Sequence, residues 1–200
     1  LLAYLLGSIP SAVWVGKAFY GIDVRQEGSG NAGATNTIRV LGAKAGVPVL
    51  LMDVLKGWLA VFLIAFFIPE SFTELHTTYL RIGAAAAAVL GHVFPVFAGF
   101  KGGKGIATLL GVGIALYPLA VLVVIGIFVL VLLVSGYVSL ASISGAVSFP
   151  FIVIFLFHPG TLPLILLAIF VGIFVPLTHR KNINRLLNGT ESKFSLRKKS

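Results

Sequence analysis

A run of small and amide-bearing residues at positions 28–36 offers many hydrogen-bond donors in a short length of chain. Glycines let an anion approach the backbone N–H groups closely, and hydroxyl and amide side chains add neutral donors. The candidate phosphate ligands here are Ser29, Gly30, Asn31, Thr35 and Asn36. Arg39 follows at helical spacing and would share a face with Thr35 and Asn36. We interpret the run as a phosphate-binding loop; the alternative is a polar turn before an N-capped helix.

The same run also matches the dinucleotide-binding pattern G-x-G-x-x-G, with Asp53 twenty residues beyond Gly33. That pattern needs a buried strand before it and a βαβ unit around it. No strand precedes the run, and no βαβ unit fits before the next apolar segment. The sequence context therefore argues against a dinucleotide-binding fold.

A second glycine-rich stretch, Gly91–Thr108, contains Lys101 and Lys104. It is not a Walker A motif, because glycine rather than Ser or Thr follows the second lysine. We expect Gly102 and Gly103 to open a helix whose free N–H groups, together with the two lysines, bind a phosphate. The alternative is that the lysines only anchor a membrane span.

A third basic stretch runs from His179 to Lys193. Its apolar residues recur at helical spacing and predict a short amphipathic helix, with Gly189 as its cap. His179 and Asn182 lie three residues apart and would share a face of that helix, which makes them further candidates. The alternative is a membrane-surface helix with ordinary basic residues.

Other polar residues lie inside or between the apolar segments. We expect His92 to be a packed, hydrogen-bonded helix residue rather than a catalyst. Asp53 and Lys56 are three residues apart within one apolar segment, which favours a structural ion pair. A short serine cluster consists of Ser139, Ser142 and Ser144. Of these, Ser142 is a candidate phosphate ligand, although serines also pack helices together.

The composition indicates a membrane protein. The 200 residues are 58% hydrophobic and 10% charged, with a mean hydropathy of +1.05. A soluble domain carries about 25% charged residues. There is no cysteine and no cluster of metal ligands, so we expect no disulfide, no metal and no cofactor. The net charge of +9 fits basic loops held on the cytoplasmic side of the membrane, an anionic substrate, or both. The basic residues form no single soluble face, so we expect no nucleic acid partner.

Apolar segments in a bilayer must satisfy their own backbone hydrogen bonds, which predicts an all-α fold of about seven transmembrane helices. The segments are Leu1–Phe19, Val47–Ile68, Tyr79–Phe97, Ile106–Leu116, Leu119–Val134, Ile143–Phe157 and Leu162–Leu177. The first is interpreted as a retained span rather than a signal peptide. The fourth and fifth form one broken helix in an alternative interpretation. The small residues Ala84–Ala88 predict close helix packing.

The distribution of charge predicts the topology. Thirteen of the fifteen Lys and Arg residues are Lys17 or lie in the stretches 21–46 and 98–105 or after Thr178, and the loops that alternate with these stretches carry none. With seven spans, all basic loops fall on one side, which places the N-terminus outside and the C-terminus inside. We expect one transmembrane domain over residues 1–192 and a basic tail over 193–200, disordered or lying on anionic headgroups.

The motif regions together resemble the bacterial acyl-phosphate-dependent glycerol-3-phosphate acyltransferases (the PlsY family). The matching segments are GSIPSAVWVGK with GSGNAGATN, GHVFPVFAGFKGGKGIAT and HRKNINRLLNGTESK, which extend from Gly7 to Lys193. The resemblance implies a polytopic enzyme of the bacterial inner membrane whose active site faces the cytoplasm. It implies transfer of a fatty acyl group from acyl-phosphate to glycerol 3-phosphate, which gives lysophosphatidic acid and phosphate.

The resemblance also implies the partners: glycerol 3-phosphate, acyl-phosphate, membrane lipid and a transient contact with the enzyme that makes acyl-phosphate. Neither acyl-CoA nor acyl carrier protein would be the direct donor. In this hypothesis Lys104 and Arg39 clamp phosphate, and either His179 or a substrate phosphate oxygen accepts the hydroxyl proton. No histidine is followed by aspartate five positions on, which argues against the His-Asp mechanism of soluble-donor acyltransferases.

Two other classes of function compete with this interpretation. A transporter or channel for phosphate esters would suit basic loops and broken spans, but no polar track crosses the apolar segments. A lipid-binding scaffold would not need so many clustered donors.

Overall fold

A computed structural model describes residues 1–194, and every regular element within that range is a helix. The α-helices are α1 (Leu2–Gly7), α2 (Ser11–Tyr20), α3 (Ala34–Leu41), α4 (Ala43–Ile64), α5 (Glu74–Val93), α6 (Ile106–Leu116), α7 (Pro118–Ser135), α8 (Val138–Ile152), α9 (Leu162–Thr178) and α10 (Arg180–Leu187). Short 3₁₀ turns, η1 (Ala65–Phe67) and η2 (Val96–Ala98), follow α4 and α5, and a π-helical turn, η3 (Val153–Phe157), extends α8. The all-α prediction is confirmed.

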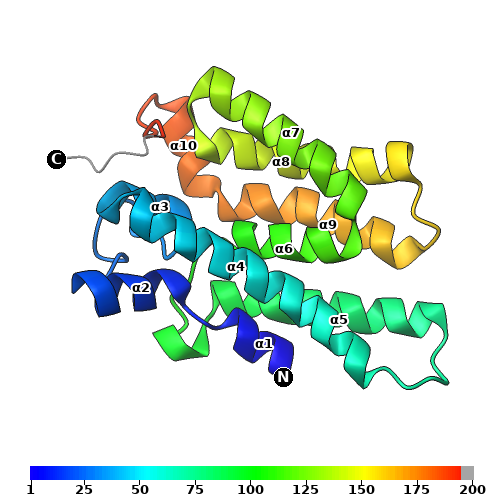
Figure 1. The fold of residues 1–200 in the computed structure, drawn as a ribbon. Helices are drawn as coiled ribbons and strands as arrows, with labels where there is room; N and C mark the ends of the chain where they lie inside the picture. The colour runs from blue at the N-terminus through cyan, green and yellow to red at the C-terminus, as the bar shows by residue number, and fades with distance from the viewer. Residues whose placement is uncertain (195–200) are drawn as a thin grey trace.

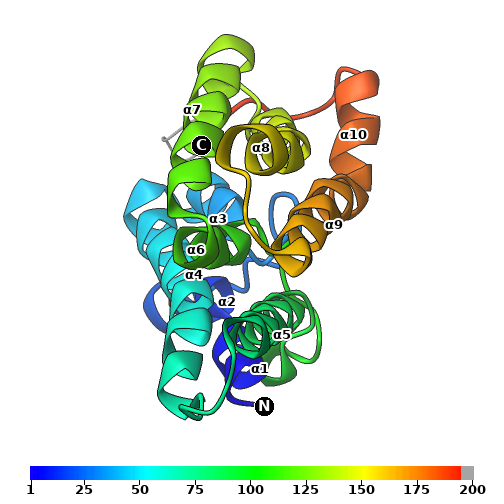
Figure 2. The same cartoon turned by 90° about the vertical axis from the view of Figure 1, so that its right-hand side faces the viewer.

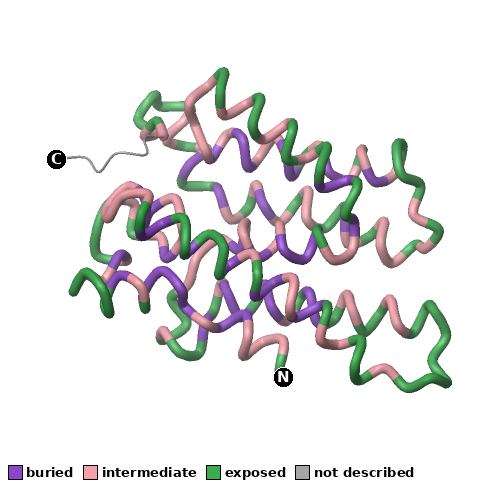
Figure 3. Tube along the Cα trace, in the orientation of Figure 1, coloured by how far each residue is buried: buried purple, intermediate pink, exposed green. Residues whose placement is uncertain are grey.

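The long helices form one bundle with α6 at its centre. Seen along the bundle, α6 has α4, α5, α7, α8 and α9 around it (Figure 2). The buried stretches lie on the sides of helices that face one another, and the outer faces are exposed and apolar (Figure 3). Among the described residues, four helices are long and apolar enough to cross a membrane, or five if α9 and α10 form one span bent by 60°. This supports an integral membrane fold; the count of seven spans stays a prediction.

The first apolar segment differs from the single span that we expected. It is divided at Ser8–Pro10 into α1 and α2, because proline disfavours helix at the residue before it. The alternative of one broken helix across the fourth and fifth segments is also not what the structure has. Helix α6 ends at Leu116, the N–H of the next residue, Tyr117, donates to the Gly113 carbonyl, and α7 then runs back over α6 toward the end where α3 and α10 lie (Figure 1).

Small residues allow the helices to approach closely. A Cβ atom added to Gly7 of α1 would collide with the carbonyl of Ala88 in α5, and one added to Gly111 of α6 would collide with that of Val54 in α4. Ala84, Ala85 and Ala88 are all buried. The predicted role of the alanine patch in close packing is therefore confirmed.

A buried ion pair joins α4 to the break between α1 and α2. Lys56 Nζ lies 2.7 Å from Asp53 Oδ1 and donates to the carbonyl of Ile9 at 2.8 Å. Ser11 donates to the same carboxylate oxygen at 2.9 Å. The predicted structural pair is confirmed, and its second function is to hold the carbonyl that the proline break leaves without a helical partner.

The three motif regions lie at one end of the bundle, beside α2, α3 and α10, and the connections around 68–73 and 158–161 lie at the other (Figure 1). The amphipathic helix is α10, and Gly189 follows it with φ of +66°, as predicted. The Phe194 N–H donates to the Gly136 carbonyl at 2.8 Å, and the division into a domain over 1–192 and a tail over 193–200 stays a prediction. Residues 195–200 lie outside the described residues.

Candidate active site

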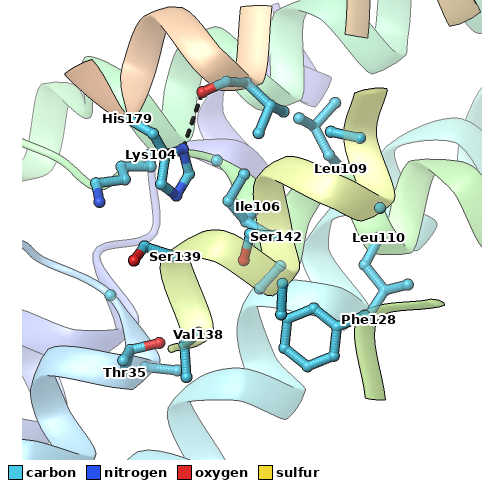
Figure 4. Close-up of a pocket in the computed structure, with 18 of the residues that line it drawn as sticks. Thr35, Lys104, Ile106, Leu109, Leu110, Phe128, Val138, Ser139, Ser142 and His179 are labelled. Atoms are coloured by element: carbon cyan, nitrogen blue, oxygen red, sulfur yellow. Dashed lines mark hydrogen bonds between the residues drawn. The ribbon is translucent and has the colours of Figure 1, made fainter. Parts of the chain in front are cut away.

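A cavity of about 520 Å³ lies between the motif end of the bundle and the helices α6 to α9. Its polar lining comes from all three motif regions and from α8. Its apolar lining comes from the inward faces of α6, α7, α8 and α9. In Figure 4, Thr35, Lys104, Ser139 and His179 lie on one side, and Leu110 and Phe128 lie on the other. One continuous cavity thus has a cationic end and an apolar end.

A chain of hydrogen bonds crosses the polar end. The Lys104 ammonium donates to Asn182 Oδ1, and Asn182 Nδ2 donates to Glu191 Oε1 at 2.7 Å. Ser139 of α8 donates to the same Glu191 oxygen at 2.7 Å. The loop before α6 is thereby tied to α10 and α8, which are far apart in sequence. Because the carboxylate and the ammonium contact the amide from opposite ends, the orientation of the Asn182 side chain is determined.

The pKa of Lys104 is shifted toward neutral pH. Burial lowers the pKa of this lysine, Glu191 raises it, and the cations Arg185 and Arg39 lower it, with a net value of about 8. Lys104 is therefore a cation at pH 7, but one for which a bound anion would be a favourable partner.

His179 lies where α9 bends into α10, and only 3% of its surface is exposed. Its Nδ1 is 2.9 Å from the Val175 carbonyl, the contact that is dashed in Figure 4. A carbonyl can only accept, so Nδ1 carries the proton and donates. The neutral ring therefore leaves Nε2 as an acceptor in the lining of the cavity.

The first loop, which precedes α3, contributes Ser29 and Asn31 to the cavity, and α3 contributes Thr35 and Arg39. Asn36 also borders it, but its hydrogen-bonding groups are already used. Its Oδ1 accepts from the backbone and hydroxyl of Ser29, and its Nδ2 donates to the carbonyls of Val24 and Glu27. Asn36 thus shapes the loop, and the expectation that it is a free donor to phosphate is corrected.

Four predicted ligands lie outside the cavity lining: Gly30, Lys101, Gly102 and Gly103. The N–H groups of Gly102 and Gly103 donate to the carbonyls of Val93 and His92 at 3.1 and 3.2 Å, so they are not free. The helix opens at Ile106 instead. Gly102 and Gly103 are needed because a Cβ at either position would collide with α5, including the His92 ring.

Gly30 and Lys101 lie outside the cavity lining for two different structural reasons. The Gly30 N–H closes a turn on the Glu27 carbonyl at 3.0 Å, with φ of +72°. The Lys101 residue is exposed. Neither is presented to the cavity, although both flank residues that are.

The two glycine-rich loops are joined by Arg25, which no motif argument had singled out. Its guanidinium donates to the Ala98 carbonyl at 2.8 Å and to both oxygens of Asp23. This contact holds the pKa of Asp23 well below its usual range. The salt bridge therefore fixes the first loop against the second.

His92 is packed, as predicted, with its ring beneath Gly103. Its Nδ1 has no hydrogen-bond partner among the described residues, and the nearest carboxylate oxygen, Asp53 Oδ1, is 3.7 Å away. The expected hydrogen bond of that nitrogen is absent from the described part of the chain.

Glu191 is a residue of the candidate site that the motifs in the sequence did not indicate. It lines the cavity and links Asn182 to Ser139, as described above. A signal existed: it is the lone acidic residue in the basic stretch 179–193. A single carboxylate among cations is typical of a charge that orders its neighbours. No motif in the sequence indicated the apolar half of the cavity lining.

Fold and site together define an integral membrane protein whose cationic pocket opens into an apolar cavity, which suits a ligand with an anionic head and a hydrocarbon tail. Residues 1–189 match the family model for glycerol-3-phosphate acyltransferase. A glycerol-3-phosphate acyltransferase of Fusobacterium nucleatum is 48% identical over 194 residues, covering 97% of this chain and 95% of the relative. One of Chlorobium phaeobacteroides is 44% identical over 219 residues, covering 96% and 93%.

Solved structures agree with these relatives. The crystal structure of PlsY (YgiH), an integral membrane glycerol 3-phosphate acyltransferase, in its glycerol 3-phosphate form has a TM-score of 0.84 at 40% identity, over 96% of this chain and 92% of that one. The lysophosphatidic acid form has a TM-score of 0.81 at 39% identity, over 98% and 93%. The chain belongs to the glycerol-3-phosphate acyltransferase family, and it is an integral membrane acyltransferase of phospholipid synthesis.

Proposed function

We propose that this enzyme transfers a fatty acyl group from acyl-phosphate to glycerol 3-phosphate, giving lysophosphatidic acid and inorganic phosphate. The observation that carries the proposal is the single cavity with Lys104 and Arg39 at one end and hydrocarbon side chains at the other. Acyl-phosphate has this same division between phosphate and hydrocarbon. The second substrate needs only the polar end, because glycerol 3-phosphate has no apolar part.

Acyl-phosphate is an activated anhydride, so the enzyme needs mainly to orient the reactants and stabilise charge. The substrate hydroxyl oxygen attacks the acyl carbonyl carbon, a C–O ester bond forms, and the C–O bond to phosphate breaks. Lys104 and Arg39 hold the two phosphates, with Ser29, Asn31 and Thr35 as neutral donors. Ser142 of α8, which also lines the cavity, adds a further hydroxyl donor.

The hydroxyl proton has two candidate acceptors. One is His179 Nε2, which is left without a proton because Nδ1 donates to the Val175 carbonyl. The other is an oxygen of a substrate phosphate, whose second pKa is about 6. Replacing His179→Gln separates them: loss of turnover with substrate binding intact supports the histidine, and near-normal turnover supports the phosphate.

The proposed setting is the bacterial inner membrane, with seven spans, the N-terminus outside and the active site facing the cytoplasm. The basic residues gather at the end of the bundle that holds the site, which fits the preference of cationic loops for the cytoplasmic side. A transient contact with the enzyme that makes acyl-phosphate would deliver the donor at this surface.

The decisive experiment uses protein purified in detergent, with acyl-phosphate and glycerol 3-phosphate as substrates and acyl-CoA as the control donor. We expect equal amounts of lysophosphatidic acid and phosphate from acyl-phosphate, and no product from acyl-CoA. Lys104→Ala should abolish most turnover, whereas the exposed Lys101→Ala should leave it nearly intact. Product from acyl-CoA at a comparable rate would overturn the choice of donor.

A further inference from the structure

The inward face of α8 changes from polar to apolar along its length. Ser139, Ser142, Ala146 and Phe149 follow at spacings of three or four residues, share a helix face and all line the cavity. Ser139 is held at the polar end by Glu191. Phe149 is ten residues further along and therefore lies about 15 Å deeper, at a rise of about 1.5 Å per residue.

Two aromatic rings close the deep end of the cavity. Tyr117 and Phe149 meet edge to face, with ring centroids 5.1 Å apart and planes at 86°. The Tyr117 hydroxyl donates to the Leu164 carbonyl at 2.7 Å, which prevents the ring from swinging away. The other buried members of their cluster are Ala120, Val153 and Ala168. Since none of those three lines the cavity, the aromatic pair is the wall between the cavity and the packed core.

The length of α6 gives the same depth for the cavity. Lys104 and Tyr117 are separated by α6, whose 11 residues span about 16 Å. An extended hydrocarbon rises about 1.25 Å per carbon, because a C–C bond of about 1.52 Å projects that much on the chain axis. The distance from the cationic end to the aromatic wall therefore corresponds to roughly 12–13 extended carbons.

We infer that Tyr117 and Phe149 are the specificity-determining residues for acyl-chain length, because they form the floor that the end of the chain meets. The inference rests on the proposed function, since it assumes that the acyl group lies in this cavity. Chains that reach the floor bury all their methylene groups, and each methylene that cannot enter costs about fourfold in binding. Selectivity should therefore decline steeply beyond the length that fits.

The cavity has a lateral opening that provides the competing path. Leu50 of α4 and Ile125 and Val129 of α7 line it and are also exposed toward the surroundings of the bundle. A chain that leaves between α4 and α7 would lie in lipid and would never meet the aromatic wall. In that case chain length would not depend on residues 117 and 149, which makes the two paths separable.

The test measures kcat/KM of the purified enzyme for a series of acyl-phosphates from about 10 to about 18 carbons, a range that brackets the half-thickness of a ~30 Å hydrocarbon core. Ala146→Leu fills the cavity about one helical turn, or ~5 Å, above Phe149, and should lower the optimal length by roughly four carbons. Phe149→Leu should raise it by roughly two carbons, because the wall recedes. Phe151→Leu is the matched control, since that side chain is 59% exposed and outside the cavity.

Opposite shifts in the two cavity variants, with the control unchanged, support the floor. An unchanged length profile in a variant that still turns over short donors overturns it and favours the lateral path. If Phe149→Leu does not fold, the downward shift of Ala146→Leu decides alone. Failure of the unsubstituted enzyme to use any acyl-phosphate is a different result, which overturns the proposed function and the inference with it.

Discussion

Lys56 and Lys104 are both buried lysines, yet their surroundings differ. Lys56, with 5% of its side chain exposed, contacts the Asp53 carboxylate and the Ile9 carbonyl inside the bundle. Lys104 contacts the neutral amide of Asn182, and the nearest carboxylate of the network, Glu191, lies behind that amide. The first lysine has its charge compensated within the fold. The second faces a cavity with its charge available.

This difference separates a structural cation from one that awaits a ligand. A buried charge is tolerated when it is paired, and an unpaired one is costly. The low pKa of Lys104, about 8, records that cost, because burial is its main cause. Such perturbed groups in a cavity are typical of functional sites. The comparison therefore predicts that changes at Lys56 act on stability and changes at Lys104 act on turnover.

The largest effect is expected from breaking the structural pair. Lys56→Met leaves Asp53 buried without its cation, and should reduce the free energy of unfolding by about 3–5 kcal/mol. Thermal unfolding in detergent measures this loss. The double variant Asp53→Leu with Lys56→Met should recover most of it, because no unpaired charge remains. An unchanged unfolding temperature in the single variant would contradict the structural role.

Removing Lys104 should reduce turnover and leave stability nearly unchanged. Lys104→Ala is expected to lower kcat about 10²–10³-fold, the usual effect of losing one charge-stabilising group. Its unfolding temperature should stay within a few degrees of the parent, since a costly buried charge disappears. Lys101→Ala, on the same loop but exposed, is the control and should remain active. Strong destabilisation by Lys104→Ala would contradict the assignment of a structural role to Lys56 and a functional role to Lys104.

The pH dependence sharpens the comparison. Lys104 is charged below its pKa of about 8 and neutral above it, so phosphate binding should weaken as pH rises through that value. We expect kcat/KM to fall about tenfold per pH unit on the alkaline side. Lys104→Arg keeps its charge and should move this fall out of the measured range, even if its rate is lower. A profile that is the same in both proteins would assign the titration elsewhere.

The smallest effect is expected from Glu191, which contacts the Asn182 amide group on the side away from Lys104. Glu191 raises the pKa of Lys104, so Glu191→Gln should shift the alkaline fall of kcat/KM to lower pH. The substituted amide still has an oxygen that can accept from Ser139 and Asn182, which preserves the network's shape. Glu70→Gln, at the far end of the bundle, is the control. A shift to higher pH would contradict the assigned direction.

Much of the fold follows from local properties of the sequence. The apolar runs, the ion pair of Asp53 with Lys56, the amphipathic α10 and its Gly189 cap depend on neighbours within a few residues, so periodicity and spacing predict them. The break before α2 at Pro10 was not predicted, because an apolar run looks continuous even where its helix is broken.

The site was predicted less completely because its contacts are between distant residues. Gly102 and Gly103 looked like phosphate ligands, but their amides bond to the end of α5. Asn36 looked like a free donor, but the first loop uses all of its hydrogen-bonding groups. Whether an N–H is free depends on what packs against it, and no local pattern contains that information.

The sequence by itself determined that the chain lies in a membrane, that its cations gather in three stretches and that these stretches suit anions, since composition and spacing are sufficient for such conclusions. Tertiary structure alone decided which donors face a common cavity, that Glu191 joins them and that Tyr117 with Phe149 closes the other end. The physical reason is that helix packing brings together residues separated by tens of positions, and a cavity is the space that such packing leaves unfilled.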